Sequence, residues 1–150
     1  MNPIVEYFKL YIDKELGPEF PPFTKWLGGV LRKVEEGELE VGFIVRPEMA
    51  NPVGLLHGGV QNAIIDDVIG MSVATVGHET FFLSLNLYVD YLGKAKVGEK
   101  IVAKSKIFRS GKQIVNAQCD LLDIEGNIIS RGTSNLLKSN IPAFSGSAPK

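Results

Sequence analysis

The feature that most constrains this chain is a segment, residues 60–76, that fits a helix with apolar residues on almost every side. The apolar residues recur at the three-then-four spacing of a helix, one set defining a face and another filling a second face. The first set is Val60, Ala63, Ile64, Val68, Met71 and Ala74, and the second is Ile65, Ile69, Val73 and Val76. A helix that is apolar nearly all round is a buried helix. The rest of the chain is therefore expected to curl around this helix.

Two adjacent carboxylates, Asp66 and Asp67, interrupt the apolar segment. Charge without a partner is strongly disfavoured in a dry interior, so each carboxylate must find partners or reach solvent at a helix edge. A carboxylate in apolar surroundings is also a candidate base or nucleophile. Periodicity alone does not choose between the two, because the helical neighbours Ile64 and Met71 place Asp67 on the apolar stripe.

The helix is preceded by His57-Gly58-Gly59. Backbone N–H groups at a helix start can hold an oxyanion, and together with the carboxylates they point to acyl-transfer chemistry. Each residue also has a structural interpretation. The glycines permit a tight entry into the helix, and His57 is a candidate for capping or packing.

The other segments alternate between apolar and polar residues, as strands do. They are residues 28–35, 39–45, 81–91, 100–109, 113–123 and 127–138. Turns are predicted at residues 36–38, 110–112 and 125–127, each of which contains a glycine. Six strands and one long helix after the second strand predict an α+β fold, with an antiparallel sheet curled around a central helix.

Three regions are expected along the chain. Residues 1–27 form an amphipathic helix over 3–16, stopped by Gly17-Pro18, and a proline-rich connector. Residues 28–139 form the main domain, and residues 140–150 a flexible tail rich in serine and proline.

Composition excludes several classes of protein. At 150 residues the chain is one domain, and its net charge of −1 implies no broad basic face for nucleic acid. The single cysteine, Cys119, lies in an alternating run and is expected to be a buried thiol in a reducing compartment. The N-terminal segment is too charged for a signal peptide, and no apolar run approaches the ~18 residues that span a bilayer. We therefore expect a cytoplasmic protein without membrane or nucleic-acid partners.

A longer pattern adds to this interpretation. Asn51 stands six residues before the His-Gly-Gly motif, Asp66 nine residues after His57, and Ser84 begins a strand that runs to Tyr91 and is followed by the turn Gly98-Glu99. Over residues 28–139 this pattern resembles the hotdog-fold acyl-CoA thioesterases of the phenylacetate-pathway and THEM2-like group. The resemblance implies a hotdog fold, an acyl-CoA substrate, no cofactor, and a homodimer or dimer of dimers.

The resemblance also implies roles for individual residues. The Gly58 N–H would polarise the thioester carbonyl, and the family spacing selects Asp66, rather than Asp67, as general base or nucleophile. Ser84 would position the attacking water. Asn51 and His57 would orient the carbonyl or hold the loop.

Helix geometry gives an independent reason to expect a dimer. Gly58 and Asp66 lie eight positions apart, which corresponds to ~12 Å along a helix. One thioester does not readily meet both, so a site that combines them would take Gly58 from one subunit and Asp66 from the other.

Coenzyme A needs backbone or cationic partners for its phosphates. The candidates are Gly59, Arg109, Gly111, Lys112 and Lys138. An acyl pocket could be lined by the aromatic residues of the N-terminal region, which are Phe8, Tyr11, Phe20, Phe23 and Trp26.

Two other functions remain open from the sequence: a hotdog dehydratase or hydratase, and a non-catalytic acyl-CoA-binding dimer. A serine-hydrolase elbow around Ser72 is disfavoured, because that serine falls inside the helix. No metal site is expected, since His57 and His78 lack the spacing of metal ligands. The sequence does not indicate the acyl group.

Overall fold

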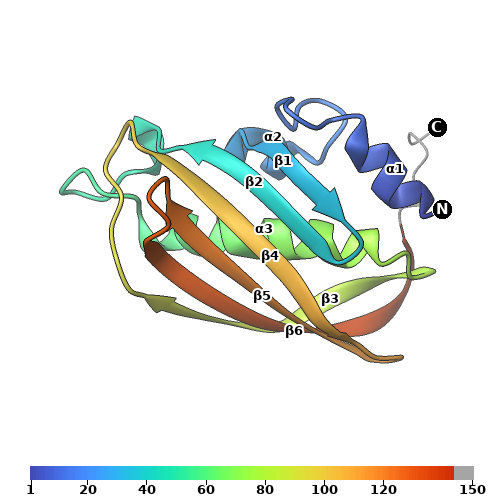
Figure 1. Cartoon of the computed structure of the whole chain (residues 1–150). Helices are drawn as coiled ribbons and strands as arrows, with labels where there is room; N and C mark the ends of the chain where they lie inside the picture. The colour runs from blue at the N-terminus through green and yellow to red at the C-terminus, as the bar shows by residue number, and fades with distance from the viewer. Residues whose placement is uncertain (144–150) are drawn as a thin grey trace.

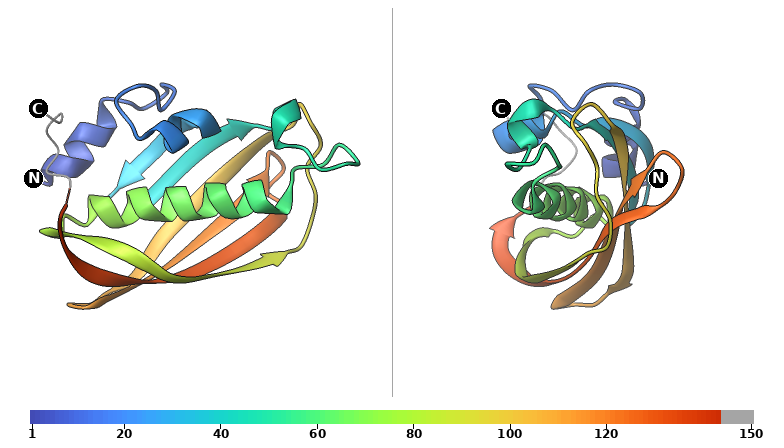
Figure 2. Two further views of the ribbon diagram at one scale, coloured as in Figure 1. Left: turned by 180° about the vertical axis from the view of Figure 1, so that it is seen from behind. Right: turned by 90° about the vertical axis from the view of Figure 1, so that its left-hand side faces the viewer.

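A computed structural model describes residues 1–143 of the chain. Six antiparallel strands form one sheet in the order β1-β2-β4-β5-β6-β3, and the sheet curves around the long helix α3, Gly58–Thr75 (Figures 1 and 2). The strands are β1 (Val30–Glu35), β2 (Glu38–Ile44), β3 (Thr80–Tyr91), β4 (Lys100–Ser110), β5 (Ile114–Asp123) and β6 (Ile128–Pro142). The α+β architecture predicted from the sequence is confirmed.

Helix α3 occupies the centre because most of its surface is apolar. Ile64, Ile65, Val68 and Ile69 are fully buried, and the helix packs against strands β2 to β6. Burial of each such side chain contributes about 1.5–3 kcal/mol relative to leaving it exposed. The apolar side chains whose spacing predicts the helix are therefore also the ones that hold the sheet around it.

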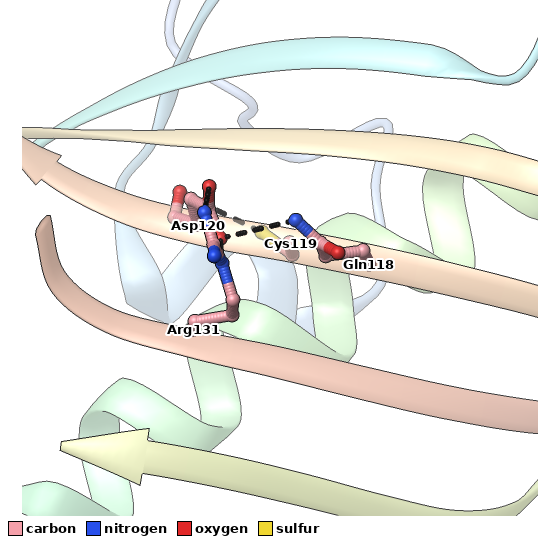
Figure 3. Close-up of polar contacts among 4 residues, drawn as sticks. All are labelled: Gln118, Cys119, Asp120 and Arg131. Atoms are coloured by element: carbon pink, nitrogen blue, oxygen red, sulfur yellow. Dashed lines mark hydrogen bonds and ion pairs between the residues drawn. The ribbon is translucent and has the colours of Figure 1, made fainter.

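Strand β5 shows how the sheet separates its two faces. Ala117, Cys119 and Leu121 are fully buried, and burial raises the pKa of the Cys119 thiol, which accords with the buried thiol expected from the sequence. Asp120 lies on the opposite face, where the Arg131 guanidinium of β6 donates two hydrogen bonds, of 2.8 and 2.9 Å, to its carboxylate (Figure 3). Asp120 and Arg131 are direct cross-strand partners, so this pair helps to fix the register of β5 and β6.

The N-terminal region departs from the prediction. Helix α1, Pro3–Lys9, ends well before residue 16. The backbone turns at Asp13, whose φ is 63°, and residues 13–16 then run beside β1, where the N–H groups of Asp13 and Leu16 donate to Leu31 and Gly29. Backbone groups of residues 13–16 thus form hydrogen bonds with the edge of β1, whereas in a longer helix they would have formed hydrogen bonds within the helix.

A second helix, α2 (Pro22–Leu27), stands where the sequence predicts only a proline-rich connector. Proline is well suited to the first turn of a helix, because its φ is already helical and its missing N–H is not needed there. Gly28 ends α2 with a left-handed φ of 70°. A short 3-10 helix, Pro47–Met49, is a further element that the sequence did not indicate.

The two edges of the sheet differ. Residues 13–16 cover β1, whereas β3 forms the opposite edge and exposes Phe81, Leu83, Leu85 and Tyr88. Strand β6 continues to Pro142, so residues 140–142 of the expected tail are part of the sheet, and residues 144–150 lie outside the described residues. No helix of residues 1–143 is long and apolar enough to cross a membrane.

Candidate active site

The start of α3 is built by His57 and two glycines. His57 caps the helix, since its Nδ1 accepts a hydrogen bond of 2.9 Å from the Gly59 N–H, and its own N–H donates to the Met49 carbonyl. The Gly58 N–H belongs to the first turn, where no intrahelical acceptor exists, and it has no partner among residues 1–143. This N–H is therefore free to bind an anionic oxygen at the positive end of the helix.

Gly58 lies against the ring of Tyr91 on β3. A Cβ at position 58 would come within 3.2 Å of that ring, so a larger residue would have to displace it. The Tyr91 hydroxyl donates to Asn62 Oδ1 at 2.8 Å and lies 3.4 Å from the Gly58 carbonyl oxygen. Tyr91 thus fixes the first turn of α3 against the sheet, a role that the sequence did not reveal although Tyr91 belongs to the recognised strand pattern.

Asn51 shapes the loop before the helix. Its Oδ1 accepts hydrogen bonds of 3.0 Å from the N–H groups of Val53 and Leu55, and its backbone N–H donates to the Leu55 carbonyl. These contacts hold residues 51–55 in a turn. These contacts are what a loop-holding Asn51 would make, and its expected role toward the thioester carbonyl stays a prediction.

Asp66 and Ser84 meet between α3 and β3. The Ser84 hydroxyl donates to Asp66 Oδ1 at 3.1 Å, and both residues are exposed in the single chain. These residues are 18 positions apart in the sequence, and it was the resemblance to the thioesterase family that linked them there. An exposed carboxylate fixed by a hydroxyl can hold a water molecule or attack a carbonyl carbon.

Asp67 is in a different environment. Its Oδ1 accepts a hydrogen bond of 3.0 Å from the Thr24 hydroxyl of α2. The pKa of Asp67 is raised to about 6, chiefly because the carboxyl is partly buried; the hydrogen bond from Thr24 lowers this pKa, and the Asp66 charge makes a smaller contribution that raises it. The sequence placed Asp67 on the apolar stripe but could not reveal Thr24, because α2 was not predicted.

Both aspartates line one mainly apolar cavity of about 460 Å³. Its walls come from α1, residues 19–24, α3, β3 and Leu136, and Phe8 and Phe20 contribute aromatic rings as expected. Tyr11, Phe23 and Trp26 do not line it; Phe23 and Trp26 instead stack on each other at the surface. Gly58, His57 and Asn51 are also absent from its lining, so one chain does not bring Gly58 to the cavity beside Asp66.

The fold brings together only some of the residues that the sequence offered as candidates for binding the phosphates of coenzyme A. Gly111, Lys112 and Lys138 line a second, open cavity of about 540 Å³, beside the 2.9 Å hydrogen bond between His78 Nε2 and Ser110 Oγ. Neither Arg109 nor Gly59 lines it. Within residues 1–143, no group of three or more His, Cys, Asp or Glu side chains is placed to hold a metal ion.

Comparison with known proteins places this geometry in a family. The family model described as the thioesterase superfamily matches residues 53–130, just over half of the chain. Acyl-coenzyme A thioesterase 13 of Homo sapiens is 27% identical over 112 residues, which cover 73% of this chain and 80% of that protein. The Mus musculus protein of the same name is 29% identical over 89 residues, or 59% of this chain and 64% of its own length.

A solved structure gives the same result for the fold. The crystal structure of a phenylacetic acid degradation-related protein from Ralstonia eutropha JMP134 superposes with a TM-score of 0.74 at 28% identity, over 81% of this chain and 92% of that one. The resemblance inferred from the His-Gly-Gly motif, the spaced aspartate and the Ser84 strand is thereby confirmed. The chain belongs to the thioesterase superfamily and has its hotdog fold.

Proposed function

We propose that this protein hydrolyses acyl-CoA thioesters to a free carboxylic acid and coenzyme A. The observation that carries the proposal is the Asp66–Ser84 pair at the wall of a mainly apolar cavity. An apolar cavity suits an acyl group, and the fixed carboxylate suits attack on the carbonyl at its end. The names of the relatives, acyl-coenzyme A thioesterase, support the same chemistry.

In this mechanism the Gly58 N–H donates to the thioester oxygen as negative charge develops there. Asp66 either removes a proton from water, which attacks the carbonyl carbon, or attacks directly to form an anhydride that water then hydrolyses. In both routes the carbon–sulfur bond breaks and the sulfur leaves as the CoA thiolate. Ser84 fixes the orientation of Asp66 and of the attacking water.

The active site is shared between two subunits, with Gly58 from one and Asp66 from the other. Two observations support this arrangement: Gly58 does not line the cavity beside Asp66, and β3, which carries Ser84, is an edge strand whose outer side pairs with no other strand of residues 1–143. A second copy joined along β3 would pair that edge and cover its exposed apolar side chains. The homodimer is the functional unit, and a dimer of dimers is its further assembly.

Lys112 and Lys138 bind the phosphates of coenzyme A, with Arg109 nearby on the same hairpin. This assignment is supported by the open cavity that the two lysines line together with Gly111. Surface lysines attract phosphate by charge, so this contact contributes to KM more than to the chemical step.

A thiol-release assay tests the proposal directly. Purified protein would be incubated with short, medium, long and aromatic acyl-CoA thioesters, and free CoA would be measured against a protein-free blank. We expect turnover of at least one class, and the ranking identifies the acyl group. Saturable binding of acyl-CoA without thiol release would instead identify a non-catalytic binding protein.

A further inference from the structure

We infer that Asp67 sets a charge preference in the acyl cavity, so that the protein hydrolyses neutral acyl groups and rejects those that carry a second carboxylate. The inference rests on the proposed thioesterase function and names the substrate class within it. It concerns the wall of the cavity beyond the Asp66–Ser84 pair.

The position of Asp67 makes this role possible. It follows Asp66 on α3, and both line the same cavity, so an acyl group whose carbonyl lies beside Asp66 extends past Asp67. Thr24 binds only Oδ1 of Asp67, and among the described residues Oδ2 accepts no hydrogen bond. One carboxylate oxygen of this cavity-lining residue is therefore left without a hydrogen-bond donor among the described residues.

The charged residues that line the cavity within the described part of the chain all have the same sign. Three carboxylates line it, Glu19, Asp66 and Asp67, whereas none of the lysine, arginine and histidine residues among residues 1–143 of the chain does. Glu19 is exposed to solvent, which screens its charge, whereas Asp67 is partly buried, where screening is weaker. A second carboxylate on the acyl chain would lose hydration in apolar surroundings and would face Asp67 without a compensating cation.

A matched pair of substrates separates this charge effect from size. Heptanoyl-CoA and adipoyl-CoA have acyl chains of similar length, but adipoyl ends in a carboxylate. We expect a higher kcat/KM for heptanoyl-CoA with the wild-type protein. In Asp67→Asn, which keeps an oxygen for Thr24 but removes the charge, the ratio of the two kcat/KM values should fall on the order of tenfold.

Glu19→Gln is the matched control, because it removes an exposed charge from the same cavity. Its ratio should change much less than that of Asp67→Asn. An unchanged ratio in Asp67→Asn, or equal use of the two substrates by the wild type, would overturn the inference. Hydrolysis of neither substrate, nor of any other acyl-CoA, would instead refute the proposed function, so the two failures are distinguishable.

Discussion

At the scale of single residues, the adjacent Asp66 and Asp67 have different surroundings because the helix turns between them. Asp66 is exposed and bound by Ser84, whereas Asp67 is partly buried and bound by Thr24. Periodicity could not separate their roles, since it ignores the hydroxyl groups that other elements bring to each carboxylate. The Asp66–Ser84 contact is the one part of the candidate site that the recognised pattern anticipated across two elements.

Alanine substitutions test the division of roles. Asp66→Ala should lower kcat on the order of a hundredfold or more, because it removes the base or nucleophile. Asp67→Ala should retain substantial turnover of a neutral substrate. Thiol release measured on both variants, with circular dichroism as the control for folding, decides the assignment, and the reverse ranking would show that Asp67 is the reacting carboxylate.

The raised pKa of Asp67 predicts an effect on stability. Because the folded pKa is about 6 and the ordinary value is 3.8, the unfolded state loses this proton first as pH rises, and stability falls between those values. The pKa difference corresponds to at most about 3 kcal/mol, and partial solvent exposure reduces the expected loss to about 2 kcal/mol. Asp67→Asn tests this effect. The other titratable groups that line the cavity, Asp66, Glu19 and Tyr7, are the same in this variant and in the wild type.

Asp67→Asn should therefore be more stable than the wild type at pH 7.5, and the difference should shrink towards pH 4. Urea unfolding at both pH values measures it. A pH-independent difference would mean that Asp67 does not titrate as its surroundings imply. A carboxylate kept where it lowers stability is typical of a functional position.

At the scale of elements, periodicity predicted what is regular and missed what depends on contacts between distant segments. The helix over 60–76 and all six strands follow from apolar patterns, and each is present within a few residues of its predicted bounds. Helix α1 ends early because residues 13–16 bind the edge of β1, and α2 forms in a segment whose prolines indicated a connector. The start of α3 was predicted in part. The glycines marked its position in the sequence, but only the structure shows that His57 caps it.

Two substitutions separate capping by His57 from a direct role in catalysis. His57→Ala removes the cap and should lower the free energy of unfolding by about 1 kcal/mol. His57→Asn supplies another good capping side chain and should restore most of that stability. Turnover that recovers with the asparagine identifies a capping role, whereas turnover lost equally in both variants would assign the imidazole a part in the reaction.

At the scale of the whole molecule, the two halves of the proposed site lie on one helix, and that geometry predicts complementation between subunits. Gly58→Pro removes the oxyanion N–H. Proline suits the backbone of this first helical position, but its side chain must displace the Tyr91 ring by a few tenths of an ångström, so circular dichroism must first show that the variant folds. Asp66→Ala removes the carboxylate. Each homodimer should be inactive, and a mixed dimer should hold one doubly damaged site and one intact site.

Random re-pairing of equal amounts makes half of the dimers mixed, so activity should recover to roughly a quarter of the wild-type value after exchange. Mild denaturant would promote exchange, mass spectrometry would confirm mixed dimers, and thiol release would be measured before and after mixing. If Gly58 and Asp66 instead acted within one subunit, both sites of each mixed dimer would be damaged. Confirmed exchange between two folded, inactive variants without recovery would therefore place the whole reaction within a single chain.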